Sequence, residues 1–192
     1  MVPADARVVD FCAGAGGKSL AMAARGSEVM ASDVRRGALK ELSRRAERAG
    51  VHVPTVVLPD EGDLPEPLFA FEPGWVLVDA PCSGVGVLRR HPEHRWHLDP
   101  EVLERRGRLQ RAILDRAEAL VPEDGTLVYA TCSLLPSENQ AVVADFLAAH
   151  PDFEAVGPAM LVAPHTDGTD GFFAQALQRS HRLQSTALRS PR

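Results

Sequence analysis

The sequence has few of the features that mark membrane, secreted or strongly basic proteins. Its 192 residues include three cysteines and one tyrosine, aromatic residues make up 5%, and the formal net charge is −5. Three widely spaced cysteines do not form a disulfide framework, so we expect reduced thiols and a cytoplasmic protein. No apolar run approaches the roughly 20 residues of a membrane span, and the first residues show no signal-peptide pattern. Because the charge balance is acidic, a nucleic-acid partner would need a local basic patch.

What the sequence does contain is a regular alternation of apolar runs and helix-like stretches. The expected strands cover residues 6–13, 27–34, 52–60, 74–82, 125–132 and 171–178. The expected helices cover residues 16–26, 35–50, 100–121 and 137–150, with Leu103, Leu109 and Ile113 on the apolar face of the third. This alternation predicts an α/β domain with a mostly parallel sheet covered on both faces. We assign residues 1–180 to one domain and residues 181–192 to a polar, mobile tail.

Ligands of such folds collect at the carboxyl ends of the strands, and the unusual residues of this chain fall there. The stretch "DFCAGAGGKSLA", residues 10–21, departs from both the Walker and the G-x-G-x-x-G templates, but its glycines allow close backbone approach. Asp33, at the end of the second strand, could accept the two hydroxyls of a ribose. Lys18 could bind a carboxylate, a group that S-adenosylmethionine (SAM) carries. The alternative is a tight turn with Asp33 as a helix cap.

Cys82 and Cys132 occupy matching positions in two different loops. Each follows an apolar strand and precedes a serine, and parallel neighbours would bring the two strand ends together. A cysteine beside a strand is usually structural, and for Cys12 that interpretation stays open. In a cleft, a cation or a helix N-terminus can convert such a thiol into a nucleophile.

The chain resembles the RsmB/Sun (Fmu) family of SAM-dependent RNA 5-methylcytosine methyltransferases. The matching stretches include "VVDFCAGAGGKSL", "VLVDAPCSGVGVLRRHPEHRW", "GTLVYATCSLLPSENQAVVADFL" and "TDGFFAQAL". The resemblance implies a Rossmann-like class I methyltransferase fold with a sheet of the seven-stranded type. It also implies SAM as cofactor and RNA as partner, with ribosomal RNA first and transfer RNA second. Members usually carry an N-terminal RNA-binding extension, which we expect to be missing here, so a separate RNA-binding region or partner could be needed.

The resemblance also implies a role for each site residue. Cys132 would be the nucleophile, Cys82 would assist product release, Asp79 would bind the base at N3, and Pro81 would shape the loop. The implied cofactor contacts are Cys12, Ala13, Gly14, Ala15, Gly16, Gly17, Lys18, Asp33, Arg36, Asp60 and Asp79. Near the adenine, Asp63 is an alternative to Asp60.

Arg89 and Arg90 are the expected phosphate contacts, and Trp96 could stack on a base. The arginines between 105 and 116 are expected to form a solvated helix face. A metal site at His91, His94 and His97 is not expected, because Pro92 interrupts a regular helix and no carboxylate completes the ligands. Two other functions stay open: a DNA cytosine-5 methyltransferase with Cys82 as nucleophile, and a SAM-binding assembly module without independent catalysis.

Overall fold

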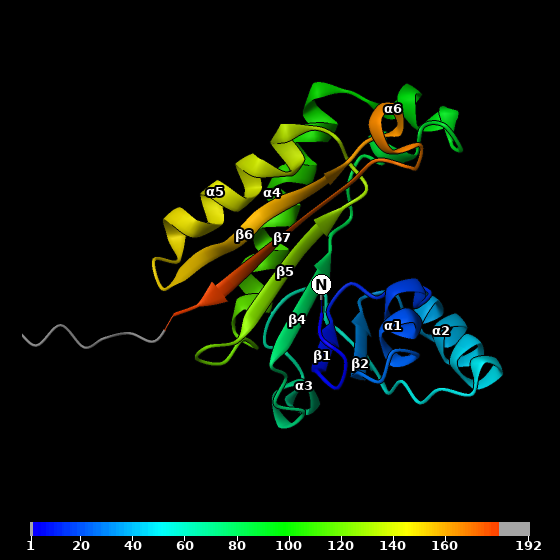
Figure 1. The fold of residues 1–192 in the computed structure, drawn as a ribbon, viewed down its shortest axis with the longest axis vertical. Helices are drawn as coiled ribbons and strands as arrows, with labels where there is room; N and C mark the ends of the chain where they lie inside the picture. Colours follow the sequence, from blue (N-terminus) through cyan, green and yellow to red (C-terminus); the bar gives the residue numbers. More distant parts are fainter. Residues whose placement is uncertain (1, 181–192) are drawn as a thin grey trace, which may run out of the picture.

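The computed structural model describes residues 2–180, so the predicted tail at 181–192 lies outside the described residues. The chain alternates strands and helices through most of its length (Figure 1). The strands are β1 (Arg7–Asp10), β2 (Glu28–Asp33), β3 (Thr55–Val57), β4 (Trp75–Asp79), β5 (Thr126–Thr131), β6 (Phe153–Val162) and β7 (Phe172–Arg179). The helices are α1 (Gly17–Ala23), α2 (Arg36–Ala49), α3 (Glu66–Ala70), α4 (Pro100–Glu118), α5 (Gln140–Ala149) and α6 (Pro164–Asp167). Three short 3-10 helices are η1 (Val85–Val87), η2 (Pro92–His97) and η3 (Pro136–Glu138).

The strands form one seven-stranded sheet in the order β3-β2-β1-β4-β5-β7-β6. The first five strands along the chain pair in parallel, β7 runs antiparallel to β5, and β6 runs antiparallel to β7. The strand order reverses between β1 and β4, which is where ligands bind in open α/β sheets. The predicted mostly parallel sheet is therefore confirmed.

Two separate apolar clusters hold the helices to the two faces of the sheet. One joins strand residues such as Val76 and Tyr129 to Leu114 of α4 and Phe146 of α5. The other joins Val29 and Ala31 of β2 to residues of α2 that include Leu39 and Leu42. In Figure 1, α4 and α5 lie behind the β4–β5–β7–β6 half, whereas α1 and α2 lie beside β2. In the part of the chain that the structure describes, no helix is long and apolar enough to cross a membrane.

Two features of the fold differ from the sequence expectation. Strand β6 was not predicted, because most of its residues are exposed and it lacks an alternating apolar pattern. The face assigned to α4 was wrong in part. Leu109 is 44% exposed, and the residues turned toward the core include Gln110 and Leu114. A polar residue therefore occupies a core position of α4.

Candidate active site at the carboxyl ends of the strands

The turn between β1 and α1 is built by its backbone. Gly14 and Gly16 both have positive φ angles, 55° and 82°. A Cβ at Gly16 would lie 2.4 Å from Cγ of Leu42, so α2 packs directly against the turn. The backbone N–H of Ala13 donates to the carbonyl of Ser32 at 2.9 Å. The glycines therefore allow the backbone of the turn to approach α2 and the end of β2 closely, and this contact fixes the turn to β2.

Asp33 lies beside this turn but is already bound by neighbouring groups. Its Oδ2 accepts from the N–H of Gly14 at 2.8 Å and from the guanidinium of Arg35 at 2.9 Å, and Oδ1 accepts from Arg35 N and Nε. Burial alone would raise the pKa of Asp33, but these hydrogen bonds outweigh it and lower that pKa. The arginine on Asp33 is thus Arg35, which was not among the predicted site residues. Arg36, the predicted cofactor contact, is exposed.

Asp10 is a second carboxylate beneath the turn, and it was not among the predicted site residues. It is 1% exposed, Ser19 Oγ donates to its Oδ2 at 2.6 Å, and its buried Oδ1 has no partner among the described residues. Burial raises the pKa of Asp10 to about 6. Burial also raises the pKa of the neighbouring Cys12 thiol, and the charges of Asp10 and Asp33 add to that rise. An unpartnered acceptor under a glycine turn suits an amino or hydroxyl group of a ligand.

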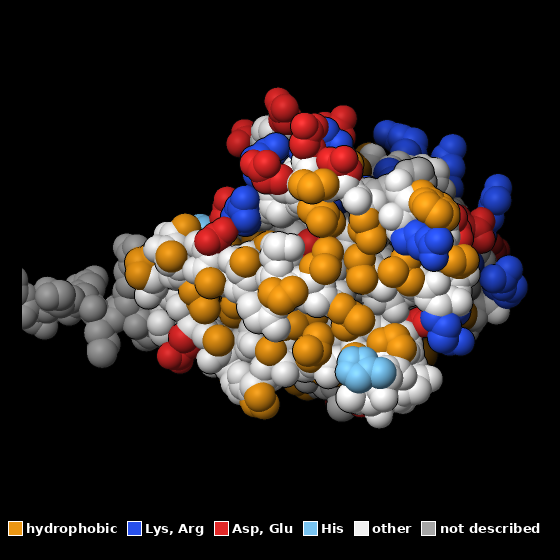
Figure 2. Space-filling view, turned by 90° about the horizontal axis from the view of Figure 1, so that it is seen from above, with side chains coloured by type: hydrophobic (Ala, Val, Ile, Leu, Met, Phe, Trp, Pro, Cys, Tyr) orange, Lys and Arg blue, Asp and Glu red, His pale blue; other side chains and the backbone are white. Residues whose placement is uncertain are grey.

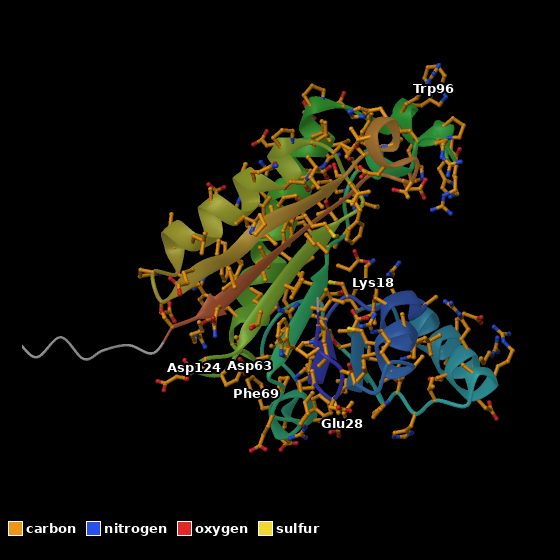
Figure 3. All side chains as sticks on the ribbon, viewed as in Figure 1. Lys18, Glu28, Asp63, Phe69, Trp96 and Asp124 are labelled. Atoms are coloured by element: carbon orange, nitrogen blue, oxygen red, sulfur yellow. The ribbon has the colours of Figure 1, made fainter. Side chains whose placement is uncertain are left out.

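Asp79, at the end of β4, faces Lys18 of α1. The Lys18 ammonium donates to Oδ2 of Asp79 and lies 5.0 Å from the ring centre of Phe172. Both ion-pair side chains keep about a third of their surface exposed. Lys18, which was predicted to bind the carboxylate of the cofactor, and Asp79, which was predicted to bind the base, are therefore neighbours. Figure 3 shows Lys18 at the edge of α1 that faces the sheet.

The two cysteine loops meet as the strand order requires. The Sγ atoms of Cys82 and Cys132 lie 3.3 Å apart. The hydrogen bond with Cys82 lowers the pKa of Cys132 to about 7, against the opposing effect of burial. The same hydrogen bond, followed by burial, raises the pKa of Cys82. One proton therefore stays on Cys82, and Cys132 is the thiol that ionises near neutral pH.

The loop after β4 is tied by its backbone to the end of β5. The N–H of Ala80 donates to the carbonyl of Ala130, and the N–H of Gly86 donates to the carbonyl of Cys132, both at 2.9 Å. A Cβ at Gly86 would lie 2.3 Å from the carbonyl oxygen of Gly171, so glycine is required there. Pro81 lies within this tied segment, and its carbonyl accepts from Gln110 Nε2 at 3.0 Å.

The expected phosphate contacts lie on the rim of the site. Arg89 and Arg90 both form ion pairs with Asp170, and both remain more than half exposed. Trp96 is 74% exposed, with the guanidinium of Arg95 4.3 Å from its ring centre. Figure 2 shows the Lys and Arg side chains of one face gathered toward its right side and the Asp and Glu side chains toward its upper edge.

Asp60 and Asp63 lie in the exposed loop that follows β3. The Arg116 guanidinium donates to the carbonyls of Pro59, Asp60 and Gly62 at 3.1 to 3.4 Å. Arg116 therefore holds this loop. The expectation that it belongs to a solvated helix face was wrong. Figure 3 places Asp63 well away from Lys18.

His91 and His94, at the start of η2 and within it, have a carboxylate neighbour after all. His91 Nδ1 lies 3.2 Å from Glu93 Oε1, and potential ligand atoms of His91, Glu93 and His94 lie within 4.8 Å of one another. The expectation that no carboxylate joins these histidines was wrong. The three residues come from one exposed turn, and the absence of a metal stays a prediction.

The sheet order, the helices on both faces and the position of the glycine turn define a Rossmann-like class I methyltransferase fold. The family model described as 16S rRNA methyltransferase RsmB/F matches residues 2–178. The chain therefore belongs to the RsmB/F family.

Individual relatives agree with this assignment. A ribosomal RNA small subunit methyltransferase B from Thermus thermophilus is 39% identical over 186 residues, which cover 90% of this chain and 45% of the relative. The crystal structure of PH0851 has a TM-score of 0.82 at 31% identity and covers 91% of this chain and 42% of its own. NSun6 from Pyrococcus horikoshii, solved with SFG, has a TM-score of 0.75 at 25% identity, with 92% and 48% covered. The chain spans less than half the length of these relatives.

Proposed function

We propose that the chain is the catalytic domain of a SAM-dependent RNA cytosine-5 methyltransferase that acts on ribosomal RNA. The observation that carries the proposal is the contact of Cys82 with Cys132, with opposite pKa shifts, beside the Lys18–Asp79 pair. Membership of the RsmB/F family and the name of the Thermus relative support ribosomal RNA as the substrate. Transfer RNA is the second candidate.

The residues of the glycine turn fit SAM as cofactor. Asp33 would accept the ribose hydroxyls in place of the Arg35 guanidinium, and the free Oδ1 of Asp10 would accept from the amino group. Lys18 would bind the carboxylate, and Ala13, Ala15 and Gly17 would contact the methionine end through their backbone. Either Asp60 or Asp63 would lie near the adenine. When bound, SAM supplies an electrophilic methyl group.

The chemistry at the base begins with the Cys132 thiolate. Its sulfur would add to carbon 6 of cytosine, and the displaced electron pair would make carbon 5 nucleophilic. N3 would take up a proton as negative charge develops on the ring, and Asp79 would accept a hydrogen bond from that N3–H through Oδ1, because Lys18 already donates to Oδ2. A base then removes the proton from carbon 5, and the carbon–sulfur bond breaks. Cys82, which holds its proton, would assist this last step by protonating the departing Cys132 sulfur.

The target base must reach two thiols that are only partly exposed. An unpaired or flipped-out cytosine would satisfy this requirement. Arg89 and Arg90 would then bind flanking phosphates after exchanging Asp170 for them, with Trp96 available for stacking. A DNA cytosine-5 methyltransferase would use Cys82 as nucleophile, and membership of the RsmB/F family disfavours this alternative.

A second candidate is a SAM-binding module that needs another region before it can methylate RNA. Stoichiometric binding of RNA without turnover would support this candidate over the first.

Calorimetric titration of SAM into wild type and Asp33→Ala tests the cofactor step of the proposal. We expect saturable binding that weakens at least about tenfold in the variant, because a ribose would lose two charge-assisted hydrogen bonds. Asp152→Asn is the matched control, since its carboxylate pairs with Arg179 at the end of β7 opposite the site. A folded wild type that binds no SAM would refute the proposal.

A further inference from the structure

Glu138, the last residue of η3, is a fully buried carboxylate that no step above uses. Its Oε1 accepts from the N–H of Ser83 at 2.8 Å and from Gln110 Nε2 at 3.2 Å. Its Oε2 accepts from the hydroxyls of Ser83 and Ser133, the latter at 2.6 Å. Four hydrogen-bond partners match the four lone-pair sites of a carboxylate, so both oxygens of Glu138 are satisfied. Among the described residues, no Lys, Arg or His forms an ion pair with it.

The two serines of this Glu138 network (Glu138, Ser83, Ser133 and Gln110) are the residues that directly follow the two cysteines. Ser83 Oγ and Ser133 Oγ lie 3.4 Å apart on the same carboxylate, just as the two Sγ atoms lie 3.3 Å apart. Both cysteine loops are therefore anchored to one point, one residue beyond each thiol. Gln110 extends the anchor to α4, because its Nε2 also donates to the carbonyl of Pro81.

The loop that carries Glu138 is fixed in turn by buried hydrogen bonds. Tyr129 Oη donates to the backbone carbonyl of Glu138 at 2.6 Å, and Thr131 Oγ1 donates to Asn139 Oδ1 at 2.6 Å. Asn139 Nδ2 donates to the carbonyl of Ser133 at 2.9 Å. The carboxylate is therefore held on a rigid support at the end of β5 and reaches across to the loop after β4.

We propose that Glu138 is a positioning residue that sets the distance between the Cys132 and Cys82 thiols by binding the serine after each of them. This role rests on the proposed function and deepens it. The Cys132 thiol must attack the base, and the Cys82 thiol must lie close enough to protonate the Cys132 sulfur when that sulfur is released. It also accounts for the serine that follows both cysteines. A chain without this carboxylate would keep both thiols but lose the common anchor of their loops.

Glu138→Gln is the sharpest test, because it preserves size and replaces an acceptor oxygen by an amide donor that faces existing donors. We expect kcat per SAM-binding site to fall about 10- to 100-fold, as misplacement by about 1 Å does in other enzymes. The KM for RNA and the affinity for SAM should stay within about threefold of wild type. Asp152→Asn, a partly buried acid away from the site, is the matched control and should change none of these quantities.

A second measurement reads the thiol distance without RNA or SAM. Dilute diamide, an azo oxidant, takes two electrons and two protons from a pair of neighbouring thiols and leaves a disulfide. The rate at which Cys82 and Cys132 join, followed by peptide mapping, should fall about tenfold in Glu138→Gln. Loss of a negative charge near Cys82 would by itself favour its thiolate and accelerate the reaction. A slower reaction therefore reports position.

The outcomes separate the two proposals. A Glu138→Gln enzyme with wild-type kcat and wild-type disulfide rate would overturn the positioning role and leave the methyltransferase proposal intact. A wild type that never methylates RNA but forms the disulfide faster than the variant would refute the activity and retain the positioning role. If Glu138→Gln does not fold, Ser133→Ala and Ser83→Ala decide the question. Each should slow disulfide formation in a folded protein, and wild-type rates in both would overturn the role.

Discussion

The glycine turn after β1 and the two cysteine loops after β4 and β5 occupy the same edge of the sheet, but they are built differently. The turn is shaped by its backbone, with positive φ angles and with Leu42 packed where a Cβ would lie. The cysteine loops have backbone hydrogen bonds at Ala80 and Gly86 as well, but their side chains also join them to each other, through the Glu138 network and the thiol contact. The turn should therefore respond to added volume, and the loops should respond to changes in charge and hydrogen bonding.

The largest effect is expected in the cysteine loops. Cys132→Ala removes the proposed nucleophile and should lower kcat for RNA methylation by about 10,000-fold or more. The affinity for SAM should change less than about threefold, because the glycine turn is untouched. Single-turnover assays with radiolabelled SAM would measure the first quantity and calorimetry the second. Turnover of the variant within tenfold of wild type would contradict the assignment of the chemical step to the cysteine loops and of SAM binding to the glycine turn.

The glycine turn can be tested by two neighbouring substitutions. Gly16→Ala places a methyl group at a φ of 82° and 2.4 Å from Leu42, which should lower the free energy of unfolding by about 2 to 4 kcal/mol. Gly17→Ala is the matched control, since a Cβ there meets nothing within 4 Å. It should change the unfolding free energy by less than about 0.5 kcal/mol. Urea unfolding curves measure both, and equal effects would contradict the packing argument.

The thiol contact predicts a shift in pH dependence. With Cys132 at a pKa of about 7, the rate of adduct formation should rise with pH and level off above about 7. Cys82→Ala removes the hydrogen bond, so this midpoint should move upward toward the ordinary value of 9.0. At pH 7 the thiolate fraction would then fall about 10- to 50-fold, so adduct would form more slowly even though it persists longer. An unchanged midpoint in rapid-quench profiles would rule out the thiol contact as the cause.

The last expected effect is a gain in stability. The pKa of Asp10 is about 6 in the folded protein and 3.8 without the fold, so Asp10 loses its proton at lower pH in the unfolded chain. The free energy of unfolding therefore falls as pH rises from about 4 to about 6. Asp10→Asn removes this cost and should stabilise the protein by about 1 to 3 kcal/mol above pH 6, with no gain below pH 4. SAM affinity should fall at the same time. Thermal unfolding at pH 4 and pH 7.5 gives the comparison, and equal gains at both would contradict the titration argument.

Much of this arrangement could be predicted from the sequence because it depends on strand order. The alternation of strands and helices predicted a parallel sheet, and neighbouring parallel strands explain why Cys82 and Cys132 meet. Strand β6 has no periodic apolar pattern and could not be found in that way. The contact of Arg116 with the loop after β3 depends on how side chains pack across distant elements, so no local pattern predicted it.

Glu138 shows the same limit within the site. The sequence shows a serine after each cysteine and a glutamate in the second loop, but no spacing rule joins Ser83 to a residue 55 positions away. Gln110 was hidden for a related reason. It directly follows Leu109, which was expected on the apolar face of α4, whereas in the fold Gln110 is the one buried against the cysteine loops. Hydrogen-bond networks of this kind become visible once the strand ends are placed together.

The most direct test of the central claim is to identify the cysteine that bonds to RNA. Cys82→Ala and Cys132→Ala would each be incubated with SAM and small-subunit ribosomal RNA, and the RNA-linked peptide would be identified by mass spectrometry. The account predicts a persistent adduct on Cys132 in the Cys82→Ala protein and none in the Cys132→Ala protein. An adduct on Cys82 in the Cys132→Ala protein, with none in Cys82→Ala, would contradict it.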